Sequence, residues 1–147
     1  MKLKKLNILL ADDDTDDCTF FQEAVEDLKL SAQLTVARDG VELMQQLTSK
    51  EKELPDVLFL DINMPRKNGH ECLLEIKASK KLKELPVVMF STSNSLDKIN
   101  MLFKLGAHVY ILKPGDFTQL KQVIHHALPI ATEKISLEKR IKYILNA

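Results

Sequence analysis

Acidic, hydroxyl and ammonium side chains stand at the ends of four short apolar runs in this 147-residue sequence. The polar residues that end or follow these runs are Asp12, Asp13, Asp14, Asp61, Ser91, Thr92, Ser93 and Lys113. A cluster of carboxylates with a hydroxyl and an ammonium group nearby could support metal-assisted phosphoryl transfer. The question is whether the fold brings these groups together.

Carboxylates that gather at one place favour a bound cation. Two of them a few ångströms apart repel by about 4 kcal/mol at an effective dielectric constant near 20. A divalent cation relieves this repulsion, and hard oxygen ligands with room for water and phosphate oxygens suit Mg²⁺. The three acids at positions 12–14, together with Asp61, therefore predict a magnesium site.

Asp61 could be a helix cap, a metal ligand or a nucleophile. Its reference pKa near 3.9 predicts an ionised carboxylate at neutral pH, and cationic neighbours would keep it ionised. Beside Mg²⁺ and the ammonium group of Lys113, such a carboxylate can attack phosphorus and form an aspartyl phosphate. Transfer of this kind depends on positioning and charge neutralisation more than on proton transfer.

Five apolar runs with strand composition alternate with segments of helical periodicity. Three of the runs are almost continuously apolar, which is typical of parallel strands covered on both faces. The predicted strands are residues 6–11, 34–38, 56–61, 86–91 and 108–113. The apolar stripes of the predicted helices are Phe20, Phe21, Ala24, Val25 and Leu28; Val41, Leu43, Met44 and Leu47; Leu73, Leu74 and Ile76; Leu96, Ile99, Leu102 and Phe103; and Leu120, Val123, Ile124 and Leu128.

Five strands, each followed by a helix, predict an α/β domain with a doubly wound parallel sheet and helices on both faces. In an open sheet of this kind, ligands bind outside the carboxyl ends of the strands. If all strands are parallel, the four polar groups meet at one edge of the sheet. This convergence is the strongest functional signal in the sequence.

The composition describes an ordinary single domain. Hydrophobic residues make up 45% and charged residues 29% of the chain, and 21 basic residues balance 21 acidic ones. Nothing in this balance favours nucleic acid or a membrane surface as a partner. The N-terminal apolar run is too short to span a membrane and ends in acids where a signal peptide would be cleaved. Cys18 and Cys72 lack metal-ligand spacing, which fits a reducing compartment, and we predict the cytoplasm.

Four sequence anchors resemble those of one family, the receiver domains of two-component response regulators. The anchors are "ILLADDD", "LFLDINMPRKNG", "VVMFSTS" and "YILKP", and they occur in the order and spacing of the family. The resemblance covers residues 6 to about 128. It implies a flavodoxin-like five-stranded sheet in the order 2-1-3-4-5 and a Mg²⁺-dependent phosphoryl transfer from a phosphohistidine.

The resemblance also implies roles for individual residues. The residues implied are Asp61 as the phosphoacceptor, with Ser91 and Lys113 around its phosphoryl group; Asp12, Asp13, Asp61 and the backbone carbonyl of Asn63 as metal ligands; and Ser91 and Tyr110 as the switch. Pro114, after Lys113, would follow a cis peptide bond. The phosphoryl donor would be a sensor histidine kinase or a histidine phosphotransfer protein, and the downstream partner is an unidentified protein.

Some residues keep a second interpretation. Asp14, Thr15 or Asp16 could simply cap the first helix, and the third acid, Asp14, leaves open which two acids contact the metal. Tyr110 could be a plain packing residue. These alternatives concern positions of single side chains, which the sequence does not fix.

Two other classes of protein remain as rivals. A phosphohydrolase of the haloacid dehalogenase class also places a nucleophilic Asp at a strand end, but its signature needs Thr or Val where "DDDTD" has Asp16. A receiver-like module that binds partners without phosphorylation would not need the acids, Ser91 or Lys113. The receiver interpretation uses all of these residues.

We predict a receiver domain over residues 5–128 and a helical extension over residues 129–147, with no output domain. In the extension, apolar residues share one helical stripe; they are Leu137, Ile141, Ile144 and Leu145. The stripe could pack on its own domain or pair with a second copy. Stand-alone receivers that partner bacterial phytochromes have similar tails and can dimerise, so a homodimer is possible.

Overall fold

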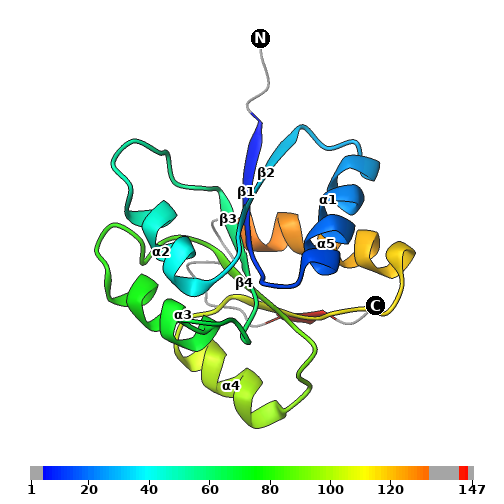
Figure 1. Ribbon diagram of the computed structural model, residues 1–147. Helices are drawn as coiled ribbons and strands as arrows, with labels where there is room; N and C mark the ends of the chain where they lie inside the picture. Colours follow the sequence, from blue (N-terminus) through cyan, green and yellow to red (C-terminus); the bar gives the residue numbers. More distant parts are fainter. Residues whose placement is uncertain (1–4, 133–142, 146–147) are drawn as a thin grey trace.

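The computed structural model describes residues 5–132 and 143–145. It shows a parallel sheet with helices on both faces (Figure 1). The elements in chain order are β1 (Leu6–Ala11), α1 (Thr15–Asp27), β2 (Ala32–Ala37), α2 (Gly40–Thr48), β3 (Val57–Leu60), α3 (Gly69–Ala78), β4 (Val87–Ser91), α4 (Leu96–Lys104), β5 (Val109–Leu112), α5 (Phe117–Thr132) and β6 (Tyr143–Leu145).

The order of the strands is β2-β1-β3-β4-β5-β6, and every neighbouring pair is parallel. The first five strands therefore have the predicted order. The sheet reverses its winding between β1 and β3, and crevices at such a point are where ligands bind in doubly wound sheets. Asp61 lies beside this point, because its backbone N–H donates to the carbonyl of Ala11 at the end of β1 (3.0 Å).

The helices cover the sheet in two groups. Helices α1 and α5 lie on one face, and α2, α3 and α4 lie on the other (Figure 1). Alternate residues of each strand point to opposite faces. Phe59 therefore packs in the cluster under α1 and α5, whereas Leu58 and Leu60 pack in the cluster under α2, α3 and α4. This is why β3 is apolar at every position.

Polar side chains at the helix starts accept hydrogen bonds from free backbone N–H groups. Asp14, Asp39, Asn68 and Ser95 each cap a helix in this way. Asn68 forms a full capping box with Glu71. Such caps contribute about 1 kcal/mol each and fix where the helices begin after the loops at the carboxyl ends of the strands.

Three residues of the predicted apolar stripes are exposed. Phe20 retains 50%, Leu74 44% and Leu96 66% of its accessible surface. Each was predicted to lie on a buried helix face because it is apolar and stands near other apolar residues that are three or four positions apart. The sheet covers only a narrow stripe of each helix, and these positions lie beside it.

The predicted helical extension is only partly correct. Helix α5 continues through the predicted domain boundary at residue 128 and through Pro129 to Thr132. Residues 143–145, predicted as helical, instead form the short strand β6 at the edge of β5. This sixth strand was not predicted. Of the predicted stripe, Leu137 and Ile141 lie outside the described residues.

Candidate phosphoacceptor site

Three carboxylates meet at the carboxyl ends of β1 and β3. Asp12, Asp13 and Asp61 each present an oxygen, and these oxygens lie within 4.8 Å of one another. Strand pairing explains the approach, since Ala11 and Leu60 are partners in the register of β1 and β3 and each precedes an acid of the cluster. Asp12 and Asp61 are buried, whereas Asp13 is exposed.

Asp14 has a separate role. Its carboxylate accepts a hydrogen bond from the backbone N–H of Asp17 (3.0 Å), so it is the N-cap of α1. The open choice among Asp14, Thr15 and Asp16 is thereby resolved in favour of Asp14. The acids that cluster with Asp61 are Asp12 and Asp13, as predicted for the metal site.

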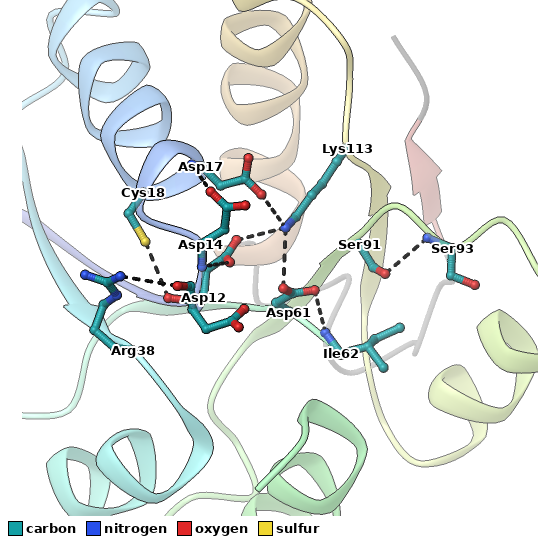
Figure 2. A network of polar contacts seen from close by, with 11 residues as sticks. Asp12, Asp14, Asp17, Cys18, Arg38, Asp61, Ile62, Ser91, Ser93 and Lys113 are labelled. Atoms are coloured by element: carbon teal, nitrogen blue, oxygen red, sulfur yellow. Dashed lines mark hydrogen bonds and ion pairs between the residues drawn. The ribbon is translucent and has the colours of Figure 1, made fainter. Parts of the chain in front are cut away.

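The ammonium group of Lys113 reaches the cluster from the end of β5. Its Nζ lies 2.9 Å from Asp12 Oδ2, 2.8 Å from Asp17 Oδ2 and 3.4 Å from Asp61 Oδ2 (Figure 2). The group also lies over the ring of Phe90, 5.2 Å from its centroid. The sheet therefore brings Lys113 to Asp61 from 52 residues away in the sequence, as the convergence argument predicted.

Burial raises the pKa of Asp61 from 3.8 to about 6, although Lys113 lowers it, and the charge of Asp12 adds to the rise. A hydrogen bond from the backbone N–H of Ile62 to Oδ1 (2.8 Å) also favours the charged form. The sequence predicted an ionised Asp61 at neutral pH but not this rise in its pKa, which occurs because the desolvation of a buried carboxylate exceeds the effect of one cation here. Asp61 is still mostly ionised at pH 7.

Burial lowers the pKa of Lys113, but the hydrogen bonds to Asp17 and Asp12 and the charge of Asp61 raise it more. The net pKa lies above its ordinary value. Lys113 is therefore a permanent cation beside Asp61. A fixed positive charge at this point can stabilise a phosphoryl group without any proton transfer.

Ser91 and Tyr110 are both buried. The hydroxyl of Ser91, at the end of β4, accepts a hydrogen bond from the backbone N–H of Ser93 (3.2 Å). Tyr110 donates its hydroxyl to the backbone carbonyl of Ser93 (2.7 Å). The two predicted switch residues are thus joined through Ser93, and Tyr110 already points into the protein.

The loop after β3 turns back sharply beside Asp61. The N–H of Gly69 donates to the carbonyl of Ile62 (2.8 Å), and a Cβ atom on Gly69 would lie 2.1 Å from the carbonyl oxygen of Asp61. Asn63 is an exposed residue of this loop, two positions after Asp61. The described residues contain no cis peptide bond, so the bond before Pro114, expected to be cis, is trans. An X–Pro bond favours trans by only about 0.5–1 kcal/mol, and sequence alone does not fix its isomer.

Two residues of the site were not predicted. Asp17 forms the shortest contact with Lys113, and Arg38 donates to the carbonyl of Asp13 (3.2 Å) and to the hydroxyl of Thr15 (2.7 Å). Asp17 lies four positions after Asp13, in the first turn of α1. The sequence shows an acidic residue in the first turn of the helix, but it does not show that the side chain of Asp17 points towards the end of β5.

The donor set fits a divalent cation. Asp12, Asp13 and Asp61 offer three carboxylate oxygens close enough to share one ion, and oxygen ligands of this kind bind Mg²⁺, Mn²⁺ and Ca²⁺. Asp13 faces solvent and leaves room for water. The cluster therefore has the chemistry of a divalent metal site of the open type.

Comparison with known proteins gives the class to which this fold and site belong. Residues 8–125 match the response regulator receiver domain, so the chain belongs to that family of two-component signalling proteins. Among the described residues, no helix has both the length and the apolar character needed to cross a membrane.

Particular relatives include phytochrome response regulators. Response regulator Rcp1 of Synechocystis sp. is 30% identical over 134 residues, which cover 88% of this chain and 91% of Rcp1. The phosphorylated cyanobacterial phytochrome response regulator RcpA has a similar structure, with a TM-score of 0.80, 31% identity, and coverage of 88% of this chain and 96% of RcpA. A Mn²⁺-bound structure of Rcp1 gives a TM-score of 0.78 at 28% identity and covers 88% of this chain and 96% of that one.

Proposed function

We propose that this chain is a single-domain response regulator that accepts a phosphoryl group on Asp61. The donor is a phosphohistidine of a sensor histidine kinase or of a histidine phosphotransfer protein. The observation that carries the proposal is the meeting of Asp12, Asp13 and Lys113 around the Asp61 carboxylate. The phosphorylated state of RcpA and the metal-bound state of Rcp1 support it by similarity.

The transfer is a substitution at phosphorus. An oxygen of Asp61 forms the new O–P bond, the P–N bond to the donor histidine breaks, and the freed imidazole takes up a proton. Asp12, Asp13, Asp61 and the carbonyl of Asn63 would hold Mg²⁺, which supplies positive charge to the phosphoryl oxygens. Lys113 neutralises the phosphoryl group from the other side. The protein thereby promotes its own phosphorylation, and its own dephosphorylation when water replaces the histidine.

Ser91, Ser93 and Tyr110 give a route from the phosphoryl group to the surface. When the Ser91 hydroxyl turns to a phosphoryl oxygen, the N–H of Ser93 loses its acceptor. The loop after β4 then moves, and with it the Ser93 carbonyl that holds the Tyr110 hydroxyl. Phosphorylation would thus shift the population of conformations of the surface formed by α4, β5 and α5, and we propose that this surface binds the partner.

Membership of the receiver-domain family supports a proposal for the signalling context. We propose that the protein acts in the cytoplasm by binding a downstream protein or as an intermediate of a phosphorelay, without direct contact to nucleic acid or membrane. In this structure β6 pairs with β5 of its own domain. A homodimer remains part of the proposal, to be tested by light-scattering mass with and without residues 130–147.

Phosphorylation by a small phosphodonor tests the proposal. Wild-type protein incubated with acetyl phosphate should gain a phosphoryl group in the presence of Mg²⁺ and not with a chelator. Asp61→Asn should abolish the gain, whereas Asp97→Asn, which changes an exposed acid in the first turn of α4, should not.

The outcomes separate the rival classes. A phosphohydrolase would turn over many organic phosphates without keeping the label, and a module without phosphorylation would neither label nor turn over. Retained labelling of the Asp61→Asn variant would reject Asp61 as the phosphoacceptor.

A further inference from the structure

Asp17 is an acidic residue that the proposed reaction does not use. It lies in the first turn of α1, and its carboxylate crosses to the end of β5, where Oδ2 is 2.8 Å from Nζ of Lys113. This distance is shorter than the 3.4 Å between Nζ and Asp61. The closest anionic partner of the lysine is therefore not the phosphoacceptor.

The hydrogen-bonding capacity of Lys113 is fully used. A lysine ammonium group has three N–H donors, and here they face Asp12, Asp17 and Asp61. The ring of Phe90 covers another side of the group. When Asp61 carries the phosphoryl group, the N–H that faced its carboxylate can turn to a phosphoryl oxygen. A second hydrogen bond from Lys113 to the phosphoryl group requires that Asp12 or Asp17 release its own N–H.

Asp17 is the partner that can be released at the lowest cost. The side chain of Asp17 is 36% exposed, whereas that of Asp12 is fully buried and that of Asp61 is 9% exposed. A carboxylate that is partly in water regains hydration when it loses an ion pair, and a buried one does not. Asp12 is also needed at the metal site.

We propose that Asp17 is a positioning residue that holds the Lys113 ammonium in the unphosphorylated state and competes with the phosphoryl group for it. This inference rests on the proposed function. Asp17 thereby sets how tightly the site holds a phosphoryl group and how long the phosphorylated form lasts. Removal of its charge frees one donor of Lys113 and removes a negative charge near an incoming anion.

Beryllofluoride, an analogue of the phosphoryl group, measures this competition without turnover. With Mg²⁺ present, Asp17→Asn should bind beryllofluoride about threefold to fivefold more tightly than wild type, a modest gain because solvent screens a partly exposed carboxylate. Asp16→Asn removes an equal charge from an exposed position in the same helical turn, and its affinity should equal that of wild type. Asp17→Glu should restore most of the wild-type affinity.

A metal-free measurement tests the ion pair itself. Reductive methylation of Lys113, followed by mass spectrometry with the exposed Lys98 as an internal reference, should be about threefold faster in Asp17→Asn than in wild type or Asp16→Asn. A ligand-independent structural role of Asp17 would not raise the affinity for the analogue. Asp17→Ser provides a second variant if Asp17→Asn does not fold.

Equal or weaker beryllofluoride binding by Asp17→Asn and Asp17→Ser, compared with Asp16→Asn, would overturn the competition. Failure of the wild type to bind beryllofluoride or to accept a phosphoryl group would instead overturn the proposed function. The two failures are therefore distinguishable in one set of samples.

Discussion

The interior of the sheet and the carboxyl ends of its strands are built from the same short segments, but they obey opposite rules. In β3, every residue is apolar and buried. One position beyond its end stands Asp61, and among the described residues the buried polar side chains are Asp12, Asp61 and Ser91, all at strand ends. Burial of apolar residues in the interior stabilises the fold, and this stabilisation offsets the cost of burying charged groups at the strand ends.

Electrostatics shows the cost of this arrangement. The charges of the phosphoacceptor site are satisfied mainly by one another, through the three contacts of Lys113. These contacts do not offset the burial of Asp61, so the pKa of its carboxyl group stays raised at about 6. A site that destabilises its own carboxylate in the absence of ligand gains more when a cation or a phosphoryl group arrives.

Truncation in the interior should have the largest effect on stability. Phe59 is fully buried at the centre of β3 and packs against Phe21, with ring centroids 5.0 Å apart. Phe59→Ala should lower the free energy of unfolding by about 3–5 kcal/mol, measured by urea denaturation. Phe20→Ala, which truncates an exposed ring on α1, should lower the free energy of unfolding by less than about 1 kcal/mol. Equal losses would mean that the interior is not packed as described.

Gly69 tests the backbone that supports the site. Gly69→Ala forces a Cβ atom against the carbonyl of Asp61, and we expect a loss of about 3 kcal/mol together with slower phosphorylation. Gly115→Ala is the matched control, because a Cβ atom there meets nothing within 4 Å. Urea denaturation and acetyl phosphate labelling of both variants give the comparison. Normal stability of Gly69→Ala would contradict the close return of the loop.

Asp61→Asn should stabilise the metal-free protein. Because the folded-state pKa of Asp61 is raised from 3.8 to about 6, its favourable contribution is present below about pH 4 and is lost as the pH rises through about 6. Asparagine stays neutral, so the variant should exceed wild type by about 2 kcal/mol at pH 7, with the difference shrinking towards pH 4. Urea denaturation in chelator at several pH values measures it, with Asp97→Asn as control. A destabilised variant at pH 7 would show that the ion pair with Lys113 exceeds the cost of burial.

The reactivity of the two cysteines compares how accessible the strand ends and the interior are, and it needs no substitution that would change stability. Cys18 lies beside the site, with its thiol donating to the carbonyl of Asp12 (3.4 Å), and Cys72 lies on the buried face of α3 in the interior. Burial raises the pKa of both thiols to about 11. Few thiolates exist at pH 8, so iodoacetamide should modify both residues only after unfolding. Rapid modification of Cys18 alone would show that the strand ends are more open than the interior.

The sequence predicted the meeting of Asp12, Asp13, Asp61 and Lys113 because parallel strands place their carboxyl ends at one edge, whatever the details of packing. It did not predict the pKa of Asp61, since the depth of burial depends on how the neighbouring loops close. The sequence also did not predict that Asp17 contacts Lys113. A helix start gives the residue's position, but not the side to which its carboxylate turns.

The tail shows a different limit. Residues 143–145 are apolar and fit a helical stripe or a short strand equally well, because three residues carry too little periodicity to decide. The open edge of β5 determined the outcome, and that edge is a property of the whole sheet. The exposed Phe20, Leu74 and Leu96 have the same origin, since only the assembled layers define which helical positions are covered.

Mapping the phosphoryl group to a residue is the most direct test of the account. After reaction with acetyl phosphate and Mg²⁺, the modified aspartate can be reduced with borohydride and located by peptide mass spectrometry. Modification at Asp61 alone, absent when a chelator replaces Mg²⁺, is the predicted result. Modification at Asp12, at Asp13 or at a histidine, with Asp61 unchanged, would contradict the claim that the strand ends assemble a site around Asp61.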